Sequence, residues 1–508
     1  MRDLCVRLAS VVCLGVLSFA AGASPRIALN VDGQSNYSYL APWANIAGQL
    51  DANNATYWTG YIDGDYKVSW TGSGTPTFTG GRSTFQVTGA NQGILHLAHN
   101  NPGPNGGGYF TVGTTNVANL QILAPDAVPG TPFRKPFLDK VNQLVHGSVI
   151  RYMDWMQTVG SPVVNWSDRN TSMYQTSPAG VNYDNIVALS NYTHADAWIN
   201  IPAEASDDYV RQLARFLKTN LNPTLNVYIE YSNELWNGGD GRQGTWNLQQ
   251  ARSDPQFNSR ADDTGKMALR AAERLRQSVE IFKQEFGSSS RLRPEIGGFI
   301  ANSYWAQWQV DWLKSKGVNL KADNYHVAIA PYVPGSPGDL GENPGDSKDA
   351  IIQKLMAFMN GPIKTWIQQN KAMADAAGLK LDSYEADIGS FYGQTNLQTH
   401  LDLQNDPRLG DLEKQLIQMW DTESGGGLYN TFGLVSPYSE WGQWGLLNDV
   451  NAAHSVKWDA VASLVGPLGS ALITQQPFTP EPSGVGVTGI VAMASLWRRW
   501  RRQGVCSN

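Results

Sequence analysis

Residues 225–237 read Leu-Asn-Val-Tyr-Ile-Glu-Tyr-Ser-Asn-Glu-Leu-Trp-Asn, an apolar run that closes on Asn233 and Glu234. A second run, residues 379–384, reads Leu-Lys-Leu-Asp-Ser-Tyr and ends on Glu385. Each run predicts a short buried strand with a carboxylic acid at its C-terminal end. A (β/α)₈ barrel carries its catalytic groups at these strand ends. The two stretches therefore predict a barrel with two acids at one rim.

The rest of the chain alternates between strand and helix patterns. Further strands are expected at 27–31, 148–153, 198–202, 295–300, 325–330 and 428–435. Helices are expected after the N-cap Ser206, over 264–286 before Gly287, and over 304–316, 349–373, 411–421 and 453–464. Eight strands with helices between them predict an α/β fold of the (β/α)₈ TIM-barrel type. A doubly wound open sheet would alternate similarly, but no G-x-G-x-x-G opens a helix, so nothing favours a dinucleotide site.

Residues 56–125 have a different character. Short alternating segments such as 66–70, 94–97 and 109–112 are separated by Gly, Thr and Asn, and no helical period is present. This pattern predicts a small antiparallel β-rich insertion after the first barrel strand. The barrel itself would then comprise residues 24–55 and 126–470.

Both ends of the chain carry export signals. Residues 1–23 combine basic residues, an apolar stretch and an A-x-A site, which is typical of a signal peptide removed by signal peptidase. Residues 471–508 contain Pro480-Glu481-Pro482, an apolar stretch over 484–496 and four arginines, and they resemble a PEP-CTERM sorting signal processed by an exosortase. A plain tail anchor is the alternative. Either signal predicts export, transient membrane anchoring, and a final place at the cell surface or in the extracellular matrix of a Gram-negative bacterium.

Composition excludes several classes of site. The three cysteines are Cys5, Cys13 and Cys506, so the expected folded body has none for disulfides, thiolate metal sites or a cysteine nucleophile. The leader contributes +1 and the four arginines after residue 482 contribute +4 to a net charge of −6, so residues 24–482 carry −11. An acidic body is a poor partner for nucleic acid.

The strand-end acids carry a resemblance to a known superfamily. Asn233-Glu234 ends the expected fourth strand and Glu385 the seventh, as in the clan A glycoside hydrolases. Residues 151–155, 198–202 and 230–237 also resemble a group of secreted bacterial proteins labelled cellulose-binding. The resemblance implies a retaining O-glycoside hydrolase acting on an extracellular polysaccharide or oligosaccharide, with Glu234 as acid/base and Glu385 as nucleophile.

The resemblance also implies roles for other side chains. Asn233 would bind the sugar 2-hydroxyl, and Arg151 would keep the nucleophile ionised. His326 and Tyr332 would lie near the nucleophile. Trp444 would form a platform under the cleaved sugar, and Trp236 would line an outer subsite.

Chemistry sets the expected order of the two pKa values. Glu234 must be protonated in the free enzyme, so its pKa should lie above that of Glu385. Asp387 is a rival nucleophile. Glu230 is expected to have a structural role with an arginine partner, and Arg151 could instead form an ion pair with Asp154 or Glu230.

Other functions remain open or lack support. No H-E-x-x-H, histidine cluster or Ca²⁺-loop spacing occurs, so no metal or cofactor is implied. An esterase lacks the G-x-S-x-G elbow. A non-catalytic carbohydrate-binding or extracellular matrix protein on a barrel scaffold is the main alternative, because fold does not fix function.

Overall fold

The computed structural model describes residues 24–31, 42–50, 54–57, 61–80, 82–98, 109–172, 177–237, 241–334 and 337–465. These residues all belong to one compact unit that ends at residue 474. The expected signal peptide, the expected sorting segment and the loop at 101–104 lie outside the described residues. No helix within the described ranges is both long enough and apolar enough to cross a bilayer.

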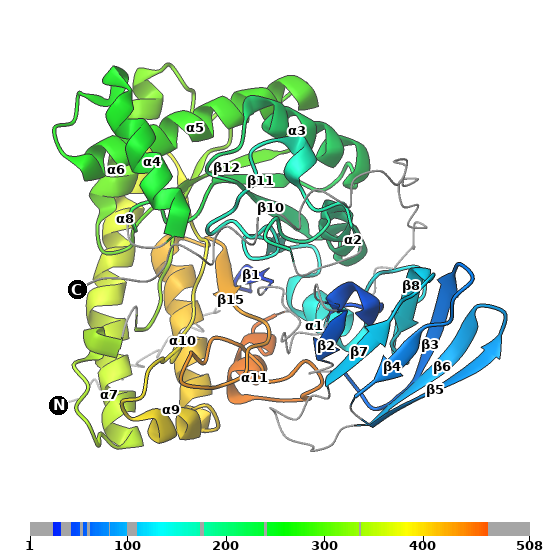
Figure 1. Cartoon of the computed structure of the whole chain (residues 1–508). Coiled ribbons are helices and arrows are strands. Elements are labelled where there is room, and N and C mark those ends of the chain that lie inside the picture. The colour runs from blue at the N-terminus through cyan, green and yellow to red at the C-terminus, as the bar shows by residue number, and fades with distance from the viewer. Residues whose placement is uncertain are drawn as a thin grey trace, which may run out of the picture. The chain divides into compact units, whose positions relative to one another are not determined.

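Eight parallel strands form the central sheet (Figure 1). In chain order they are β1 (Ile27–Asn30), β9 (Val149–Arg151), β10 (Asp196–Ile201), β11 (Val227–Tyr231), β12 (Leu292–Gly297), β13 (His326–Ile329), β14 (Lys380–Ser383) and β15 (Tyr429–Phe432). From β1 to β14, each of these strands pairs with the next barrel strand along the chain. A doubly wound sheet reverses direction at a switch point. This order never reverses, so the open-sheet alternative is wrong.

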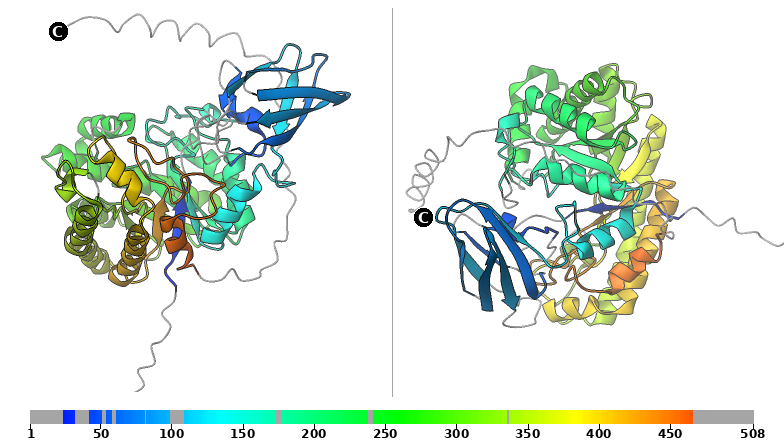
Figure 2. Two further views of the ribbon diagram at one scale, coloured as in Figure 1. Left: turned by 90° about the horizontal axis from the view of Figure 1, so that it is seen from below. Right: turned by 90° about the vertical axis from the view of Figure 1, so that its right-hand side faces the viewer.

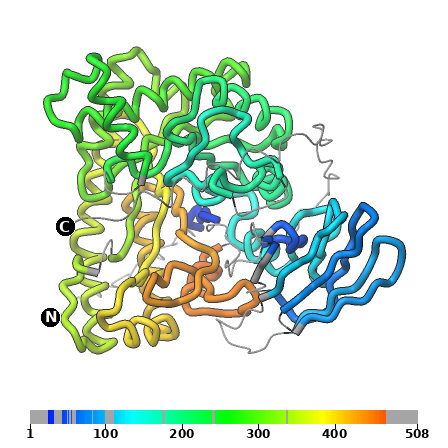
Figure 3. The backbone as a smooth tube through the Cα atoms, in the orientation of Figure 1, coloured from blue at the N-terminus to red at the C-terminus, as the bar shows by residue number. Residues whose placement is uncertain are grey.

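The sheet closes on itself. β1 pairs in parallel with β15, and Figure 3 shows these two ends of the colour scale side by side. On the other flank of β15, the Ser383 N–H donates to the Leu428 carbonyl at 2.8 Å. The Phe432 N–H donates to the Ala386 carbonyl at 2.8 Å. The fold is therefore a (β/α)₈ barrel, as predicted.

Helices follow the barrel strands and cover them. They are α1 (Lys135–Val145), α2 (Tyr183–Thr193), α3 (Asp207–Asn220), α4 (Gly241–Ser253), α5 (Asp263–Phe286), α6 (Ser303–Ser315), α7 (Lys348–Phe358), α8 (Lys364–Ala377), α9 (Leu397–Leu403), α10 (Pro407–Ser424) and α11 (Val456–Ala462). Ser206 caps α3 by accepting from the Tyr209 N–H at 3.2 Å, and Gly287 ends α5 in the left-handed region.

One expected helix is divided. Instead of a single helix over 349–373, α7 and α8 are joined by a π-turn at Met359–Ile363 that contains Pro362. Proline has no N–H to donate and its ring crowds the preceding turn, so the regular helical ladder cannot pass through it. The apolar residues keep a helical period on both sides of Pro362, so their pattern predicts one continuous helix.

The insertion after β1 forms two antiparallel sheets. One contains β5 (Arg82–Gly89), β6 (Gln92–Ala98), β3 (Gly64–Thr71) and β8 (Ala118–Leu123), in that order. The other contains β2 (Ala55–Tyr57), β7 (Tyr109–Gly113) and β4 (Thr77–Thr79). Figure 2 shows these strands in blue as a group of their own. In the four-stranded sheet, the buried apolar face is formed by side chains of β3 and β6, namely Tyr66, Val68, Trp70, Leu95 and Leu97.

Candidate active site

Arg151, the last residue of β9, is the centre of a buried polar network. Its Nε and Nη2 donate to the two carboxylate oxygens of Glu230 at 2.9 and 3.0 Å. Its Nη1 donates to Oε1 of Glu385 at 2.5 Å. The amide oxygens of Asn30 and Asn233 accept from it at 3.1 and 2.9 Å. The guanidinium is fully buried, so these charge-assisted bonds fix the end of β9 to the ends of β1, β11 and β14.

Glu230 is the arginine-bound anchor of this network. Besides Arg151, its Oε2 accepts from Nε1 of Trp198 on β10 at 2.9 Å. Glu230 lies one residue before the end of β11, and its side chain is buried inside the barrel. These contacts agree with the structural role expected for it, and they identify Arg151 as its partner.

Glu385 lies two residues beyond β14, between a cation and a hydroxyl. Its Oε1 accepts from Arg151, and its Oε2 accepts from the Tyr332 hydroxyl at 2.8 Å. Burial raises the pKa of Glu385, while the Arg151 charge and the Tyr332 hydrogen bond oppose that rise. Both oxygens of this buried carboxylate are thus held in a fixed orientation.

Glu234 faces the same interior from the end of β11. Its Oε1 accepts from the Tyr384 hydroxyl at 3.0 Å. Burial raises the pKa of both Tyr384 and Tyr332 well above the usual value, and the charges of Glu234 and Glu385 raise each of them further. The Tyr384 ring, whose hydroxyl donates to Glu234, also lies 5.2 Å from the Arg151 guanidinium that binds Glu385, so the two carboxyl groups face one region. The expected order of the Glu234 and Glu385 pKa values stays a prediction.

The backbone that carries Glu234 is unusual. Ser232 and Glu234 have φ values of 60° and 43°, in the left-handed region that residues with a side chain rarely adopt. Such a residue costs about 1–3 kcal/mol and persists where its surroundings fix it. The Ser232 carbonyl accepts from the Asn200 side chain at 2.8 Å, and the Ser232 N–H donates to the Ile201 carbonyl at 2.8 Å. These two bonds hold the turn from which Glu234 reaches the Tyr384 hydroxyl.

Aromatic rings flank both acids. Trp444 makes edge contacts with Tyr332 and Phe432 at 6.0 and 5.9 Å between ring centroids, and it stacks on Tyr392 at 6.2 Å. On the other flank, Trp236 stacks on Phe299 at 5.8 Å and lies 6.1 Å from Tyr384. Both tryptophans are therefore placed beside residues that contact the candidate acids.

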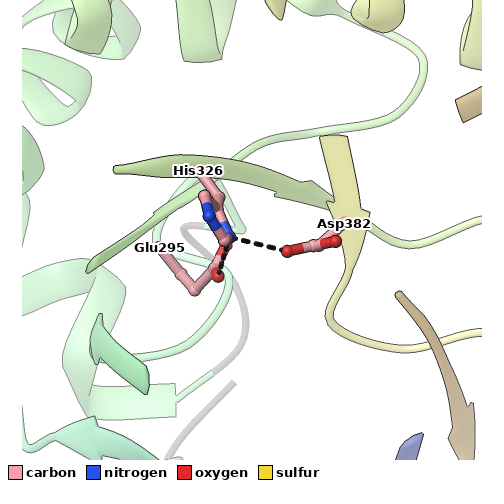
Figure 4. Close-up of side chains that lie close together, drawn as sticks. All are labelled: Glu295, His326 and Asp382. Carbon is pink, nitrogen blue, oxygen red and sulfur yellow. Dashed lines mark hydrogen bonds and ion pairs between the residues drawn. The ribbon is translucent and has the colours of Figure 1, made fainter. Parts of the chain in front are cut away.

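His326 is the one predicted site residue that the structure places elsewhere. It begins β13, at the opposite end from the rim, and its Nδ1 contacts Glu295 and Asp382 (Figure 4). Burial lowers the pKa of His326, but the Glu295 charge and the Asp382 hydrogen bond outweigh it and raise the pKa to about 9. Burial raises the pKa of Glu295 to about 8. None of the hydrogen bonds that His326 makes to described residues involves Glu234 or Glu385.

Asp387, the rival nucleophile, is fully buried against a lysine. Nζ of Lys457 lies 3.2 and 3.3 Å from its two carboxylate oxygens. Burial raises the pKa of Asp387 to about 6, and the lysine opposes the rise. This ion pair lies between β14 and α11, so Asp387 faces the helical layer while Glu385 faces Arg151.

Sequence reasoning missed several residues of the Arg151 network and of the separate cluster around His326. They are Asn30, Trp198, Glu295, Asp382 and Tyr384. A local signal existed for two of them: Tyr384 immediately precedes Glu385, and Asn30 lies near the end of the first expected strand. The others lie in strand interiors, where a polar residue facing inward cannot be told from one facing a helix.

Comparisons with known proteins add similarity of fold only. No protein-family model matches the chain, and a search of curated proteins found no match. Among solved structures, it is similar to the GH51 arabinofuranosidase from Xanthomonas axonopodis pv. citri, with a TM-score of 0.44 and 16% identity over 66% of this chain and 67% of that one. A GH10 protein from Paenibacillus barcinonensis gives a TM-score of 0.39 and 11% identity over 66% and 92%. The GH5-4 broad specificity endoglucanase from Clostridum cellulovorans gives 0.40 and 13% over 66% and 88%. At these values the similarity says nothing about substrate.

Proposed function

We propose that the chain is a retaining O-glycoside hydrolase that acts on an extracellular polysaccharide or oligosaccharide. The observation that carries the proposal is the seating of Glu385. Arg151 and Tyr332 hold its two oxygens, at 2.5 and 2.8 Å, opposite a second acid, Glu234, at the same rim. A fixed, buried carboxylate beside a cation suits a nucleophile, and a second carboxyl group on the opposite side suits an acid/base.

Double displacement assigns the steps. A Glu385 oxygen attacks the anomeric carbon while Glu234 protonates the departing glycosidic oxygen. The glycosyl ester that forms on Glu385 is neutral, so the negative charge facing Glu234 falls and its proton affinity falls with it. Glu234 can then take a proton from water, which attacks the anomeric carbon and releases Glu385.

Glu230 has a distinct part in this cycle. When Glu385 becomes an ester, Arg151 would lose half of its compensation, but Glu230 keeps two hydrogen bonds to the guanidinium. The arginine therefore stays neutralised and in place through both steps. This double pairing lets the nucleophile change charge without freeing a buried cation.

Sugar contacts follow from the remaining groups. The Asn233 oxygen is occupied by Arg151, whereas its amide NH₂ has no hydrogen-bond partner among the described residues, so it can donate to the 2-hydroxyl. Trp444 offers an apolar ring face under the cleaved sugar, and Trp236 with Phe299 offers one beside Glu234. These contacts select for pyranose or furanose faces and not for a particular linkage.

Trapping the intermediate tests the proposal. A 2-deoxy-2-fluoro glycoside with an activated leaving group should label Glu385, as peptide mass spectrometry would show, and NMR of early product should show retained anomeric configuration. Glu385→Ala should abolish hydrolysis, and azide or formate should restore part of it. Asp411→Ala, a substitution of an exposed carboxylate, is the matched control and should leave activity unchanged.

Two results would sink the proposal. Inverted product would make Glu385 a base. Binding of glycans without hydrolysis of any aryl glycoside or polysaccharide would favour the carbohydrate-binding alternative.

We also propose that this activity is located outside the inner membrane, on the strength of residues 1–23 and 471–508 alone. N-terminal sequencing of protein from cells should begin near Ser24, and an exosortase-deficient strain should retain the intact C-terminal segment. An unprocessed N-terminus on the mature protein would contradict export.

A further inference from the structure

Two carboxylic acids and one imidazole meet inside the barrel, below the candidate active site. Glu295, His326 and Asp382 come from the neighbouring strands β12, β13 and β14, and all three are buried. Nδ1 of His326 lies 3.1 Å from Oε1 of Glu295 and 2.8 Å from Oδ2 of Asp382 (Figure 4). One ligand atom from each residue lies within 4.8 Å of the other two.

The way the carboxylates approach the ring is the first clue. An imidazolium has two N–H groups on opposite sides of the ring, and each donates one hydrogen bond along its own direction. A buried imidazolium between two acids would be expected to use both nitrogens. Here both acids converge on Nδ1, which carries at most one hydrogen. The three atoms lie within 4.8 Å of one another, close enough for one cation to contact all of them.

Charge is the second clue. Arg151 is ion-paired with Glu230 and Glu385, so its charge does not compensate the carboxylates of this cluster. Among the described residues, Arg26 also acts on Glu295 and Asp382, but it is an exposed residue, and Tyr228 faces them too. A single proton on His326 cancels one of the two carboxylate charges, and a proton on Glu295, whose pKa burial raises to about 8, removes the other. A divalent cation with neutral imidazole cancels both, and an uncompensated buried carboxylate is costly.

An oxygen without a partner is the third clue. Oε2 of Glu295 is buried and has no hydrogen-bond partner among the described residues. It belongs to a residue that lines a small cavity of about 20 Å³, together with Glu230 and Glu234. A cavity of this size holds one water molecule. Asp382, in contrast, is fixed, because its Oδ1 accepts from the Leu428 N–H at 2.7 Å.

We propose that Glu295, His326 and Asp382 bind one divalent transition-metal ion, of the Zn²⁺ or Mn²⁺ class. Nδ1 of His326, the Glu295 carboxylate and Oδ2 of Asp382 are the protein ligands, and the cavity beside Glu295 has room for a water ligand. A set of one imidazole and two carboxylates without sulfur suits these ions, while Ca²⁺ and Mg²⁺ prefer oxygen alone. The sequence implied no metal, because the three ligands are far apart in the chain and match no motif.

The ion would have a structural task. It would tie β12, β13 and β14 together. Its ligand Asp382 lies three residues before Glu385, so the ion would stiffen the segment that carries the candidate nucleophile. The inference does not depend on the proposed hydrolysis, since metal binding can be measured whether or not the protein cleaves a sugar.

Metal analysis of the full chain tests the site. Protein purified without chelator should contain about one Zn²⁺ or Mn²⁺ per chain by mass spectrometry of the metal. After removal of the ion, calorimetric titration with Zn²⁺ and with Mn²⁺ should restore binding, and Co²⁺ should give a visible spectrum of nitrogen and oxygen ligation. His326→Ala should weaken binding roughly 100-fold or more, because loss of a direct ligand exceeds the effect of an outer-shell change.

A second histidine serves as the control. His400 contacts one carboxylate, Glu342, through Nε2 at 2.9 Å, so His400→Ala should leave metal content unchanged. Should His326→Ala fail to fold, the shape-conserving Glu295→Gln carries the same test. Equal metal binding by the wild type and by the folded variant would overturn the proposal. Absence of binding by the wild type would do so as well, and would show that the cluster is balanced by two protons.

Discussion

Glu230 and Glu385 share the guanidinium of Arg151, although they lie on barrel strands separated by two others. Glu230 takes two of its donors and Glu385 takes one, so the three groups form a single ion-paired unit. All three are buried. In such a unit the removal of the cation leaves two carboxylates unpaired in a medium of low polarity, which is much costlier than the loss of an exposed pair.

Arg151→Met is therefore expected to destabilise the protein by about 3–5 kcal/mol, the usual cost of breaking a buried ion pair. Urea denaturation would measure it. Arg215→Met is the matched control: its partner Glu285 is paired at the surface, so its loss should cost about 0–1 kcal/mol. Adding Glu230→Met to Arg151→Met should recover part of the loss. Equal costs for Arg151→Met and Arg215→Met would contradict the view of one buried unit.

Asp406, the N-cap of α10, gives a prediction about pH. Its carboxylate accepts from the Arg408 side chain at 2.7 and 2.9 Å and from the Arg408 N–H at 3.1 Å. The Arg408 hydrogen bonds lower the pKa of Asp406 to about 2. A lowered pKa means that the stabilisation is present above the ordinary value, near 3.9, and is lost as the pH falls through about 2.

Asp406→Ala should then cost about 1 kcal/mol at pH 7, the typical value for a lost N-cap. Asp406→Asn keeps the cap acceptor and should cost less. Urea denaturation at pH 7 and at the lowest pH where the fold persists would show the gap between wild type and both variants shrinking in acid. A gap that stays constant between these pH values would exclude an ionised Asp406 as its source.

Local patterns explain how far the sequence predicted the fold and the site. The apolar runs before Asn233-Glu234 and Glu385 are periodic and short, and strand ends follow directly from them. Arg151 could be placed at a strand end, but its choice between Asp154 and Glu230 depends on the stagger of strands across the barrel. His326 was placed near the nucleophile by resemblance, whereas the register of β13 puts it at the far end of the strand. Long-range register leaves no local signal.

The break at Pro362 shows the same limit from the helical side. The apolar period continues through residues 349–373, so it predicts one helix, and only the missing N–H of a single residue marks the π-turn. Glu295 and Asp382 are similar, since each is one of several polar residues in a short strand, and the strand sequence does not tell which of them faces inward. Such residues acquire meaning only when neighbouring strands bring them together.

The last prediction concerns Glu234. If it is the acid, its loss should hurt most when the leaving group is poor, because a poor leaving oxygen needs the proton. General acid help is worth on the order of 10²–10⁴-fold, or roughly 3–5 kcal/mol of barrier. Glu234→Ala should therefore slow natural glycosides by about that factor. Activated aryl glycosides should still glycosylate Glu385 at nearly the normal rate, so the covalent intermediate should accumulate and a burst of aryl alcohol should appear.

Two further measurements separate an acid from a group that only shapes the site. The basic limb of the pH–rate profile should disappear in Glu234→Ala, because the group whose deprotonation causes it is gone. Tyr384→Phe is the matched variant: it removes the hydroxyl that donates to Glu234 at 3.0 Å but keeps the carboxyl group, so the limb should shift rather than vanish. A Glu234→Ala enzyme equally slow on both classes of substrate would mean that Glu234 positions the sugar or supports the turn at Ser232, and proton transfer would have to come from another group.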